Sequence, residues 1–312
     1  MAASEVLPRV LALGEPMIEF NQRAGSAADY LQGFGGDTSN MAIAAARQGV
    51  HAAYVTRIGA DAFGEMLMGL WRAEGIDTAA VEVDPVAPTG VYFVTHGENG
   101  HAFTYLRAGS AASRLAPSHL RPQWFRGAAF LHVSGISQAI SASACDAVFA
   151  AVEHARAAGV RVSFDPNLRL RLWPLARARA IITATLPLAD WFLPSEEDLA
   201  LLAGSREIGP QLDWCAAHGA RNVALKRGAA GVVIAQGTAR TEVPGFAAKL
   251  VDATGAGDCF DGGFIARLML GDAPVAAARY ANAAASLAVE DFGAVAPIPR
   301  PEAVHARLNA GR

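Results

Sequence analysis

The sequence lacks the features that would place it in a membrane or outside the cell. No apolar stretch approaches the roughly 18 residues of a membrane-spanning helix, and the opening residues lack the basic start and apolar run of a secretory signal. Cysteine is scarce. Cys145, Cys215 and Cys259 are odd in number and widely spaced, which favours buried free thiols in a reducing compartment over a disulfide framework. We therefore predict a cytoplasmic protein without a membrane partner.

Positive charge is not in excess either. The 312 residues carry a formal net charge of −3 and the pI is about 6.2, so the chain has no broad positive field for nucleic acid or anionic lipid. Hydrophobic residues make up 52% of the sequence, which is enough to bury the core of one large domain. Neither a tandem repeat nor a clean domain boundary is visible. We predict a single domain over residues 1–312 that binds small molecules.

Several common catalytic and nucleotide-binding motifs are missing. A Walker A loop needs Gly-Lys-Ser or Gly-Lys-Thr, but the only lysines, Lys226 and Lys249, stand in other contexts. The dinucleotide pattern G-x-G-x-x-G fails because Phe260 occupies the third glycine position after Gly255 and Gly257. Paired zinc cysteines, H-E-x-x-H and the G-x-S-x-G nucleophile elbow are absent as well.

What is present is an alternation of short apolar runs with helical patterns. The runs are rich in Val, Leu and Ile and end at Gly, Pro, Asn or Ser, which is typical of strands. Helical patterns between several of them end at a glycine. The alternation predicts βαβ units and a largely parallel sheet covered on both faces. The expected strands lie within residues 9–15, 51–59, 127–135, 160–167, 190–195, 222–228 and 231–237.

Two regions break this alternation. The segments around residues 16–33 and 89–108 alternate apolar and polar residues about a glycine-containing turn, which predicts hairpins rather than crossovers. We expect these inserted strands to form a small lid sheet beside the main body. Exposed edges of such strands often pair with another chain, so we expect a homo-oligomer whose number of subunits is open.

The segment DATGAGDCFDGGF, residues 252–264, is the most unusual loop. Gly255 and Gly257 permit a close backbone approach to a ligand. If a helix begins near Gly257, its first amides point outward and attract an anion such as phosphate. A carboxylate beside a phosphate is repelled unless it has a task, and Asp258 could accept a proton from an attacking hydroxyl. The alternative is that Asp258 merely caps the helix.

A second glycine loop, GFGGDTSN at residues 33–40, also leads into a helical pattern. Gly35 and Gly36 again allow a ligand to approach the backbone. Asp37 could accept hydrogen bonds from sugar hydroxyls, or it could cap the helix.

Together the two loops resemble a known pair of signatures. GGDTSNMA (residues 35–42) and DATGAGDCF (residues 252–260) are similar to the two motifs of the ribokinase-like (PfkB) carbohydrate kinases, in the same order and at similar distances from the two ends. The resemblance runs from LALGE to ANAAASLAVEDFGAVAPIP. It implies a three-layer α/β/α sandwich with a mostly parallel central sheet and a small β lid. It also implies phosphoryl transfer from ATP, with Mg²⁺, to a sugar hydroxyl. Some relatives require K⁺, and that requirement is left open here.

The resemblance also implies roles for individual residues. Asp258 matches the catalytic base, and the anion hole matches Gly255, Ala256 and Gly257. The sugar-binding positions match Gly35, Gly36, Asp37 and Asn40. The nucleotide-binding positions match Asn167, Ser195, Lys226, Gly228 and Asn282, together with Gly255 and Gly257. The metal is expected near Asp252.

One segment departs from the family pattern. Many members carry Asn-x-x-Glu where this chain has SEED, so that Ser195 and Asp198 replace the Asn and the Glu. Since that motif helps to organise magnesium, we expect Glu197 to compensate as a metal-binding residue. The alternative for this acidic run is a favourable interaction with the dipole of a helix N-terminus.

Within the family, three segments are most similar to the kinases of the keto sugar acid 2-keto-3-deoxygluconate. They are GEPMIEF, the stretch over residues 89–115, and DPNLR. The implied substrate contacts are Tyr92, Tyr105, Arg107 and Arg169. Arginine can bind a carboxylate through two charge-assisted hydrogen bonds, although solvated arginines and packed tyrosines are the plain alternatives.

The expected reaction is therefore ATP-dependent phosphorylation of the terminal hydroxyl to give 2-keto-3-deoxy-6-phosphogluconate. One alternative is a kinase of a neutral sugar such as fructose or ribose. The other is a sugar-binding sensor without catalysis, and the intact Asp258 with both glycine loops weighs against it.

Overall fold

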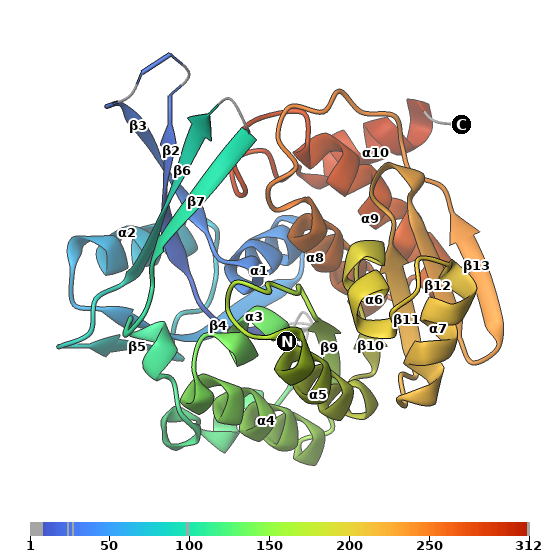
Figure 1. The fold of residues 1–312 in the computed structure, drawn as a ribbon, viewed down its shortest axis with the longest axis horizontal. Coiled ribbons are helices and arrows are strands. Elements are labelled where there is room, and N and C mark those ends of the chain that lie inside the picture. Colours follow the sequence, from blue (N-terminus) through green and yellow to red (C-terminus); the bar gives the residue numbers. More distant parts are fainter. Residues whose placement is uncertain (1–8, 24, 27, 98–99, 311–312) are drawn as a thin grey trace, which may run out of the picture.

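The computed structural model describes residues 9–23, 25–26, 28–97 and 100–310. Among these residues, nine strands form the main sheet in the order β13-β12-β11-β10-β9-β8-β1-β4-β5, at the centre of Figure 1. Every neighbouring pair from β11 to β5 is parallel, and only β12 and β13 run antiparallel to their neighbours. The strands are β1 (Arg9–Leu13), β4 (His51–Gly59), β5 (Val81–Asp84), β8 (Ala128–Ser134), β9 (Arg161–Asp165), β10 (Trp191–Phe192), β11 (Asn222–Lys226), β12 (Val232–Gln236) and β13 (Ala239–Val243).

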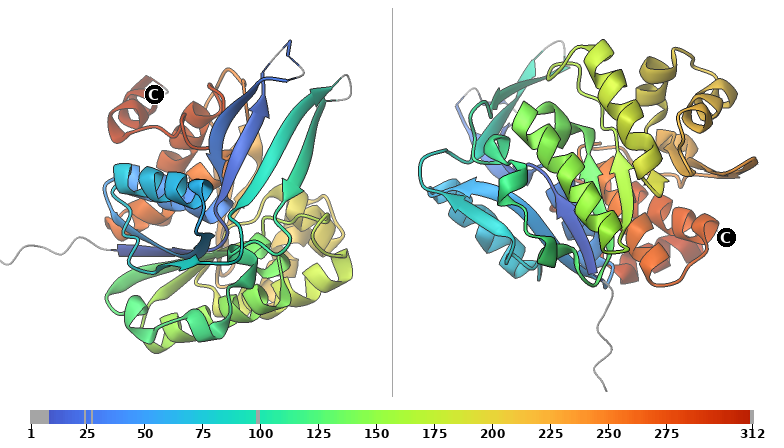
Figure 2. Two further views of the ribbon diagram at one scale, coloured as in Figure 1. Left: turned by 90° about the vertical axis from the view of Figure 1, so that its left-hand side faces the viewer. Right: turned by 90° about the horizontal axis from the view of Figure 1, so that it is seen from below.

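Helices cover both faces of this sheet, as Figure 2 shows. Successive side chains of a strand point to opposite faces, so Val10 and Ala12 of β1 enter one core while Leu11 and Leu13 enter the other. The first core is shared with α1 (Asp37–Arg47), α2 (Ala62–Ala73), α8 (Ala256–Met269), α9 (Pro274–Ala288) and α10 (Pro301–Ala310). The second is shared with α3 (Gly135–Ala139), α4 (Ala142–Ala157), α5 (Leu175–Thr185), α6 (Glu196–Ala203) and α7 (Ile208–Ala217).

A separate four-stranded sheet rises beside the main body (Figure 1). Its order is β3-β2-β6-β7, with two antiparallel hairpins joined by a parallel β2–β6 pair. This lid sheet leaves the body directly after the end of β1, because only Gly14, Glu15 and Pro16 separate β1 from β2. Its strands are β2 (Met17–Gln22), β3 (Tyr30–Gly35), β6 (Gly90–Gly97) and β7 (Gly100–Leu106).

The prediction of an α/β protein with a mostly parallel, doubly covered sheet and a small β lid is confirmed. Strands β5 and β13 were not predicted. Four of the five residues of β13 are exposed, so its sequence carries little of the apolar signal that marks a buried strand. Cys145, Cys215 and Cys259 are buried free thiols. Within the described part of the chain, no helix has both the length and the apolarity to cross a membrane.

The close approach of α1 and α8 fixes the position of the functional site. A Cβ atom on Gly262 would lie 2.5 Å from both the Ala44 Cβ and the Met41 carbonyl oxygen. Only glycine therefore lets the two helices pack at this distance. Both helices begin near the carboxyl ends of the parallel strands, which is where open α/β sheets bind their ligands. The packing brings the two predicted glycine loops together from opposite ends of the sequence.

The substitution Gly262→Ala tests this contact. Overpacking against the α1 backbone should lower the free energy of unfolding by about 1–3 kcal/mol, measured by urea denaturation. Gly263→Ala is the matched control, because its Cβ would meet nothing nearer than 3.6 Å and alanine is favoured over glycine inside a helix. Equal stability of the two variants would contradict the tight packing.

Candidate active site

The N-terminus of α8 is built from a rigid loop. Gly255 is the N-cap and has φ +75°, a left-handed conformation that suits glycine, and a Cβ there would lie 2.9 Å from the Ala294 carbonyl oxygen. The Asp252 carboxylate accepts hydrogen bonds from the Thr254 amide and hydroxyl, at 2.9 and 2.6 Å, and from the Gly293 amide at 3.0 Å. The loop therefore holds the start of the helix in one orientation.

The first turn of α8 presents an open face. Its Ala256 amide donates to the Ala253 carbonyl at 3.2 Å, whereas the Gly257 and Asp258 amides have no partner among the described residues. The first four N–H groups of a helix lack partners in the preceding turn, and the helix dipole adds partial positive charge there. A Cβ on Gly257 would meet only the Lys226 Nζ, at 3.6 Å. Because the space in front of Gly257 is otherwise open, an anion can approach the backbone closely.

Asp258 lies on this same turn and faces α1. The side-chain amide of Asn40 donates a hydrogen bond of 2.8 Å to the Asp258 carboxylate. Asp258 keeps some accessible surface, yet it sits deep among protein atoms. Burial, followed by the nearby carboxylate of Asp37, raises the pKa of Asp258 to about 7, and the Asn40 hydrogen bond opposes the shift. A carboxylate that titrates near neutrality is suited to accept a proton from a substrate.

Asp37 opens α1 on the opposite wall. Its carboxylate accepts hydrogen bonds from the Thr38 amide at 2.8 Å and from the Asn167 side chain at 3.0 Å, and burial raises the pKa of Asp37. The preceding glycines are structural requirements, since a Cβ on Gly36 would lie 2.3 Å from the Glu15 carbonyl oxygen and one on Gly35 would lie 2.5 Å from the Tyr92 hydroxyl.

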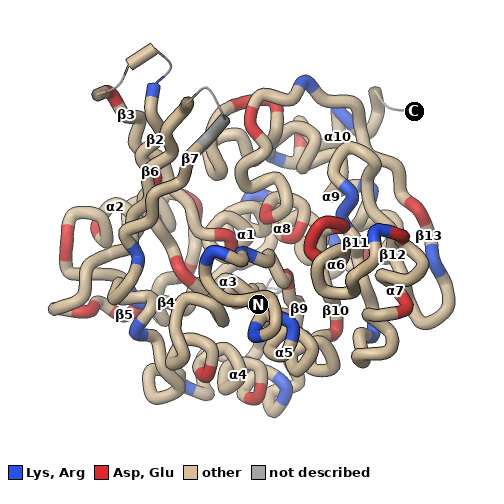
Figure 3. Tube along the Cα trace, in the orientation of Figure 1, with Lys and Arg blue, Asp and Glu red and all other residues tan. Residues whose placement is uncertain are grey.

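A buried triad underlies the two helix ends. The Lys226 ammonium contacts Asp165 at 2.8 Å and Asp261 at 3.0 Å, and the three side chains are at most 12% exposed. Burial would raise the pKa of Asp165, but Lys226 and several hydrogen bonds outweigh it and lower the pKa. Burial raises the pKa of Asp261 well above its usual range. Figure 3 shows acidic positions gathered around the starts of α1 and α8.

The loop after β9 joins this cluster. Asn167 has φ +32°, which is uncommon for a residue with a side chain, and its amide donates to Asp165 at 3.0 Å. The Leu168 amide donates to Asp198 at 3.1 Å. Asp198 and Ser195 form the capping box of α6, and burial raises the pKa of Asp198 to about 6. Ser195 and Asp198 therefore support this loop, and Glu197 is exposed.

The lid sheet supplies an aromatic surface. Tyr92 and Tyr105 stack with ring centroids 5.6 Å apart, and Phe103 stacks on Tyr105 at 6.2 Å. The Tyr92 hydroxyl donates a short hydrogen bond to Glu19, a buried residue on β2. The predicted substrate tyrosines thus lie together on one lid surface.

Arg107, directly after β7, forms a close ion pair with Glu15. The Glu15 side chain is fully buried and also accepts a hydrogen bond from Ser110 at 3.3 Å. Burial raises the pKa of Glu15 although the Arg107 guanidinium opposes the shift. The buried Arg107 Nε has no partner among the described residues, so the protein does not satisfy every donor of this guanidinium.

Three predicted residues remain, and they lie on three different segments. Arg169 is exposed and donates to the Leu168 carbonyl at 3.1 Å. Asn282 is buried on α9 and donates to the carbonyls of Val243 and Pro244, both at 3.1 Å. Gly228 follows β11 with φ +54° and open space at its Cβ position.

Sequence reasoning missed the partners of the predicted residues. Glu15 and Glu19 lie within the quoted GEPMIEF segment, and Asp165 lies within DPNLR, but a pairing with a residue far along the chain leaves no local signal. Asp261 had one signal, a second acid one turn after Asp258 on a helix that is otherwise apolar.

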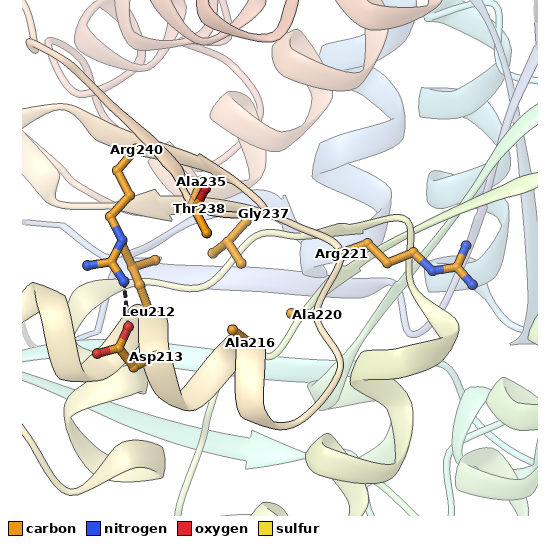
Figure 4. Close-up of a pocket in the computed structure, with 10 residues that line it drawn as sticks. Leu212, Asp213, Ala216, Ala220, Arg221, Ala235, Gly237, Thr238 and Arg240 are labelled. Atoms are coloured by element: carbon orange, nitrogen blue, oxygen red, sulfur yellow. Dashed lines mark hydrogen bonds and ion pairs between the residues drawn. The ribbon is translucent and has the colours of Figure 1, made fainter.

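A separate hollow of about 230 Å³ lies between α7 and the β12–β13 hairpin (Figure 4). Arg240 on its wall pairs with Asp213 at 2.5 Å, and Arg221 extends away from the other lining residues in Figure 4. This hollow lies at the amino end of β11, opposite the end that carries Lys226. It is therefore not part of the site described above.

Comparison with known proteins gives a consistent result. The model of the pfkB family of carbohydrate kinases matches residues 7–301. The 2-dehydro-3-deoxygluconokinases of Thermoproteus tenax and Bacillus subtilis (strain 168) are each 32% identical, over 98% and 97% of this chain and 96% of their own length. Fructokinase-2 of Solanum lycopersicum is also 32% identical, over 83% of this chain and 81% of its own.

Solved structures share the fold. A putative ribokinase II from E. coli in complex with ATP and Mg²⁺ superposes with a TM-score of 0.89 at 28% identity, over 97% of this chain and 100% of that one. A fructokinase from Vibrio cholerae O395 with fructose, ADP and calcium has a TM-score of 0.89 at 31% identity, with the same coverage. These likenesses confirm the fold that the sequence resemblance implied.

The triad predicts a specific loss of stability. Lys226→Met leaves the buried Asp165–Asp261 pair without its cation and should lower the free energy of unfolding by about 3–5 kcal/mol at neutral pH, measured by urea denaturation. The loss should shrink as the pH falls, because protonation removes the uncompensated charge. Lys249→Met is the control, since the other lysine is exposed. If the two variants are equally stable, the triad does not hold the site together.

Proposed function

The chain belongs to the pfkB family of carbohydrate kinases, and we propose that it transfers the γ-phosphoryl group of ATP to the terminal hydroxyl of 2-keto-3-deoxygluconate. The products are 2-keto-3-deoxy-6-phosphogluconate and ADP. The observation that carries the proposal is the placement of Asp258, a carboxyl group with a pKa of about 7 beside the Gly257 amide at the open N-terminus of α8.

In the proposed mechanism Asp258 accepts the hydroxyl proton while the hydroxyl oxygen bonds to phosphorus and the bond to ADP breaks. The amides of Gly255, Gly257 and Asp258 would face the charge that develops on the transferred group, and such preorganised donors stabilise a transition state. The Ala256 amide donates to the Ala253 carbonyl at 3.2 Å, so Ala256 would contribute by shaping this turn. The left-handed Gly255 and the open face at Gly257 support this role.

The sugar would lie between α1 and the lid. Asp37 and Asn40 are proposed to bind its hydroxyls, with Gly35 and Gly36 providing the close approach. The buried Asn40 Oδ1 has no partner among the described residues, and an unpaired buried acceptor is costly. A substrate hydroxyl that donates to it would relieve that cost while lying next to Asp258.

The keto acid would contact Tyr92, Tyr105, Arg107 and Arg169, with its carboxylate toward Tyr105 and the arginines. The free donor on Arg107 and the stacked lid tyrosines support this assignment. Closure of the lid would exclude water and limit hydrolysis of ATP. A neutral sugar would leave the arginine donor without a charged partner.

The nucleotide is proposed to bind beside Ser195, Lys226, Gly228 and Asn282, near Asn167. Because Lys226 and Asn282 already donate to protein groups, we propose that they shape this surface more than they contact ATP. Mg²⁺ bound to the phosphates would neutralise charge on the transferred group, and Asp252 and Glu197 would hold it.

The described residues contain no group of three or more acidic, His or Cys side chains arranged for a metal. That finding fits an ion carried chiefly by nucleotide phosphates, as is usual for Mg²⁺. A role for K⁺, a cytoplasmic location and a homo-oligomeric state remain part of the proposal.

A neutral-sugar kinase is the second candidate, because a fructokinase matches this chain at the same 32% identity as a 2-dehydro-3-deoxygluconokinase does, although over 83% of the chain rather than 97%. ADP release over a panel of 2-keto-3-deoxygluconate, fructose and ribose separates the two. We expect the keto acid to have the highest kcat/KM, since its carboxylate uses the arginine donors. Equal or faster reaction of a neutral sugar would overturn the substrate assignment.

The proposed role of Asp258 as general base predicts how kcat/KM depends on pH. Protonated Asp258 cannot accept a proton, so kcat/KM should fall as the pH drops below about 7 and level off above it. Asp258→Asn should lower kcat by a factor of about 10² to 10⁴, as expected when a general base is lost, and should remove this acid limb. The control Asp146→Asn, at an exposed position of α4, should leave kcat and the acid limb of the pH profile unchanged. Unchanged turnover in Asp258→Asn would refute the role of Asp258.

A further inference from the structure

Arg171 lies in the loop between β9 and α5, two positions beyond the predicted Arg169. Its guanidinium carbon stands 5.9 Å from the centroid of the Tyr105 ring, and that of Arg107 stands 5.4 Å from the same centroid. Tyr105 belongs to the lid strand β7, whereas Arg171 belongs to the main body. Two arginines from different parts of the protein therefore meet at one lid tyrosine.

Arg107, Arg169 and Arg171 differ in how their charge is compensated. Arg107 is 11% exposed and is paired with the fully buried Glu15. Arg169 is exposed and donates a hydrogen bond to the Leu168 carbonyl at 3.1 Å. Within the described part of the chain, neither Arg169 nor Arg171 has an ion pair, and Arg171, which is also exposed, has no hydrogen-bond acceptor. Of the three, only Arg171 combines an unpaired charge with a contact to the Tyr105 ring.

On the other side of the stacked tyrosine pair, the Tyr92 hydroxyl is unsuited to a carboxylate. The hydroxyl proton of Tyr92 is donated to Glu19, so toward a ligand this hydroxyl can act only as an acceptor. A carboxylate has no proton to give it, whereas a sugar hydroxyl has one. Glu19 itself is 3% exposed and adds an acidic group behind Tyr92. A sugar acid is thus directed with its hydroxyls toward Tyr92 and its carboxylate toward Tyr105.

We propose that Arg171 is a specificity-determining residue, which supplies the uncompensated positive charge that selects a sugar carrying a carboxylate over a neutral sugar. The face of Tyr105 holds the planar guanidinium by a cation–π contact, and Arg107, neutralised by Glu15, contributes directional hydrogen bonds. This inference rests on the proposed function, because it names how the same site selects the keto acid.

Kinetics of the full-length protein with two substrates test the inference. Arg171→Gln should lower kcat/KM for 2-keto-3-deoxygluconate by roughly ten- to a hundredfold, the range for loss of a hydrogen bond to a charged group, mainly through KM. For fructose, kcat/KM should stay within about twofold, because no charge is recognised there. Arg171→Lys keeps the charge and should retain most of the preference for the acid.

Arg72→Gln is the matched control. Arg72 stands in the last turn of α2, is exposed, and has no ion pair among the described residues. Its replacement therefore changes the net charge of the protein by the same amount, but at a site away from Tyr105. If Arg171→Gln and Arg72→Gln have the same kcat/KM on both substrates while the wild-type enzyme still prefers the keto acid, only the role of Arg171 is overturned. A wild-type enzyme that does not phosphorylate the keto acid overturns the proposed function and this inference with it.

Discussion

The close packing of α1 on α8 is the constraint on which the rest of the site depends. Because Gly262 has no side chain, the two helix backbones approach within the space that a single methyl group would fill. Their N-termini then meet at one edge of the sheet, where Asn40 reaches Asp258 at 2.8 Å. Two glycine loops more than 200 residues apart in sequence thereby become neighbours in one site.

This arrangement concentrates acidic groups, and the surrounding structure has to tolerate them. Asp37, Asp165, Asp258 and Asp261 lie near one another, and burial raises the pKa of three of them. Lys226 compensates Asp165 and Asp261 at 2.8 and 3.0 Å. The remaining repulsion helps to raise the pKa of Asp258 to about 7, so the same crowding that costs stability would give the proposed base a useful pKa. In the proposed function, catalysis and folding stability are therefore coupled through this acidic cluster.

Much of this could be predicted from the sequence, because the signals are local. Apolar runs that end at Gly or Pro located most strands of the parallel sheet, and the glycines at 255 and 257 located a helix N-terminus beside Asp258. Long-range pairings left no comparable trace. The Glu15–Arg107 pair joins residues 92 positions apart and the Glu19–Tyr92 hydrogen bond joins residues 73 apart, and only the folded lid brings them together. The assigned roles of the site residues stay predictions until ligands are bound.

The most direct measurement is a crystal structure with 2-keto-3-deoxygluconate and a non-hydrolysable ATP analogue bound together. The account predicts an Asp258 carboxylate oxygen about 2.6–3.2 Å from the terminal hydroxyl of the sugar acid, with the γ-phosphate facing the amides of the α8 N-terminus. A closed complex in which that carboxylate points away from the hydroxyl, with another group in its place, would contradict it.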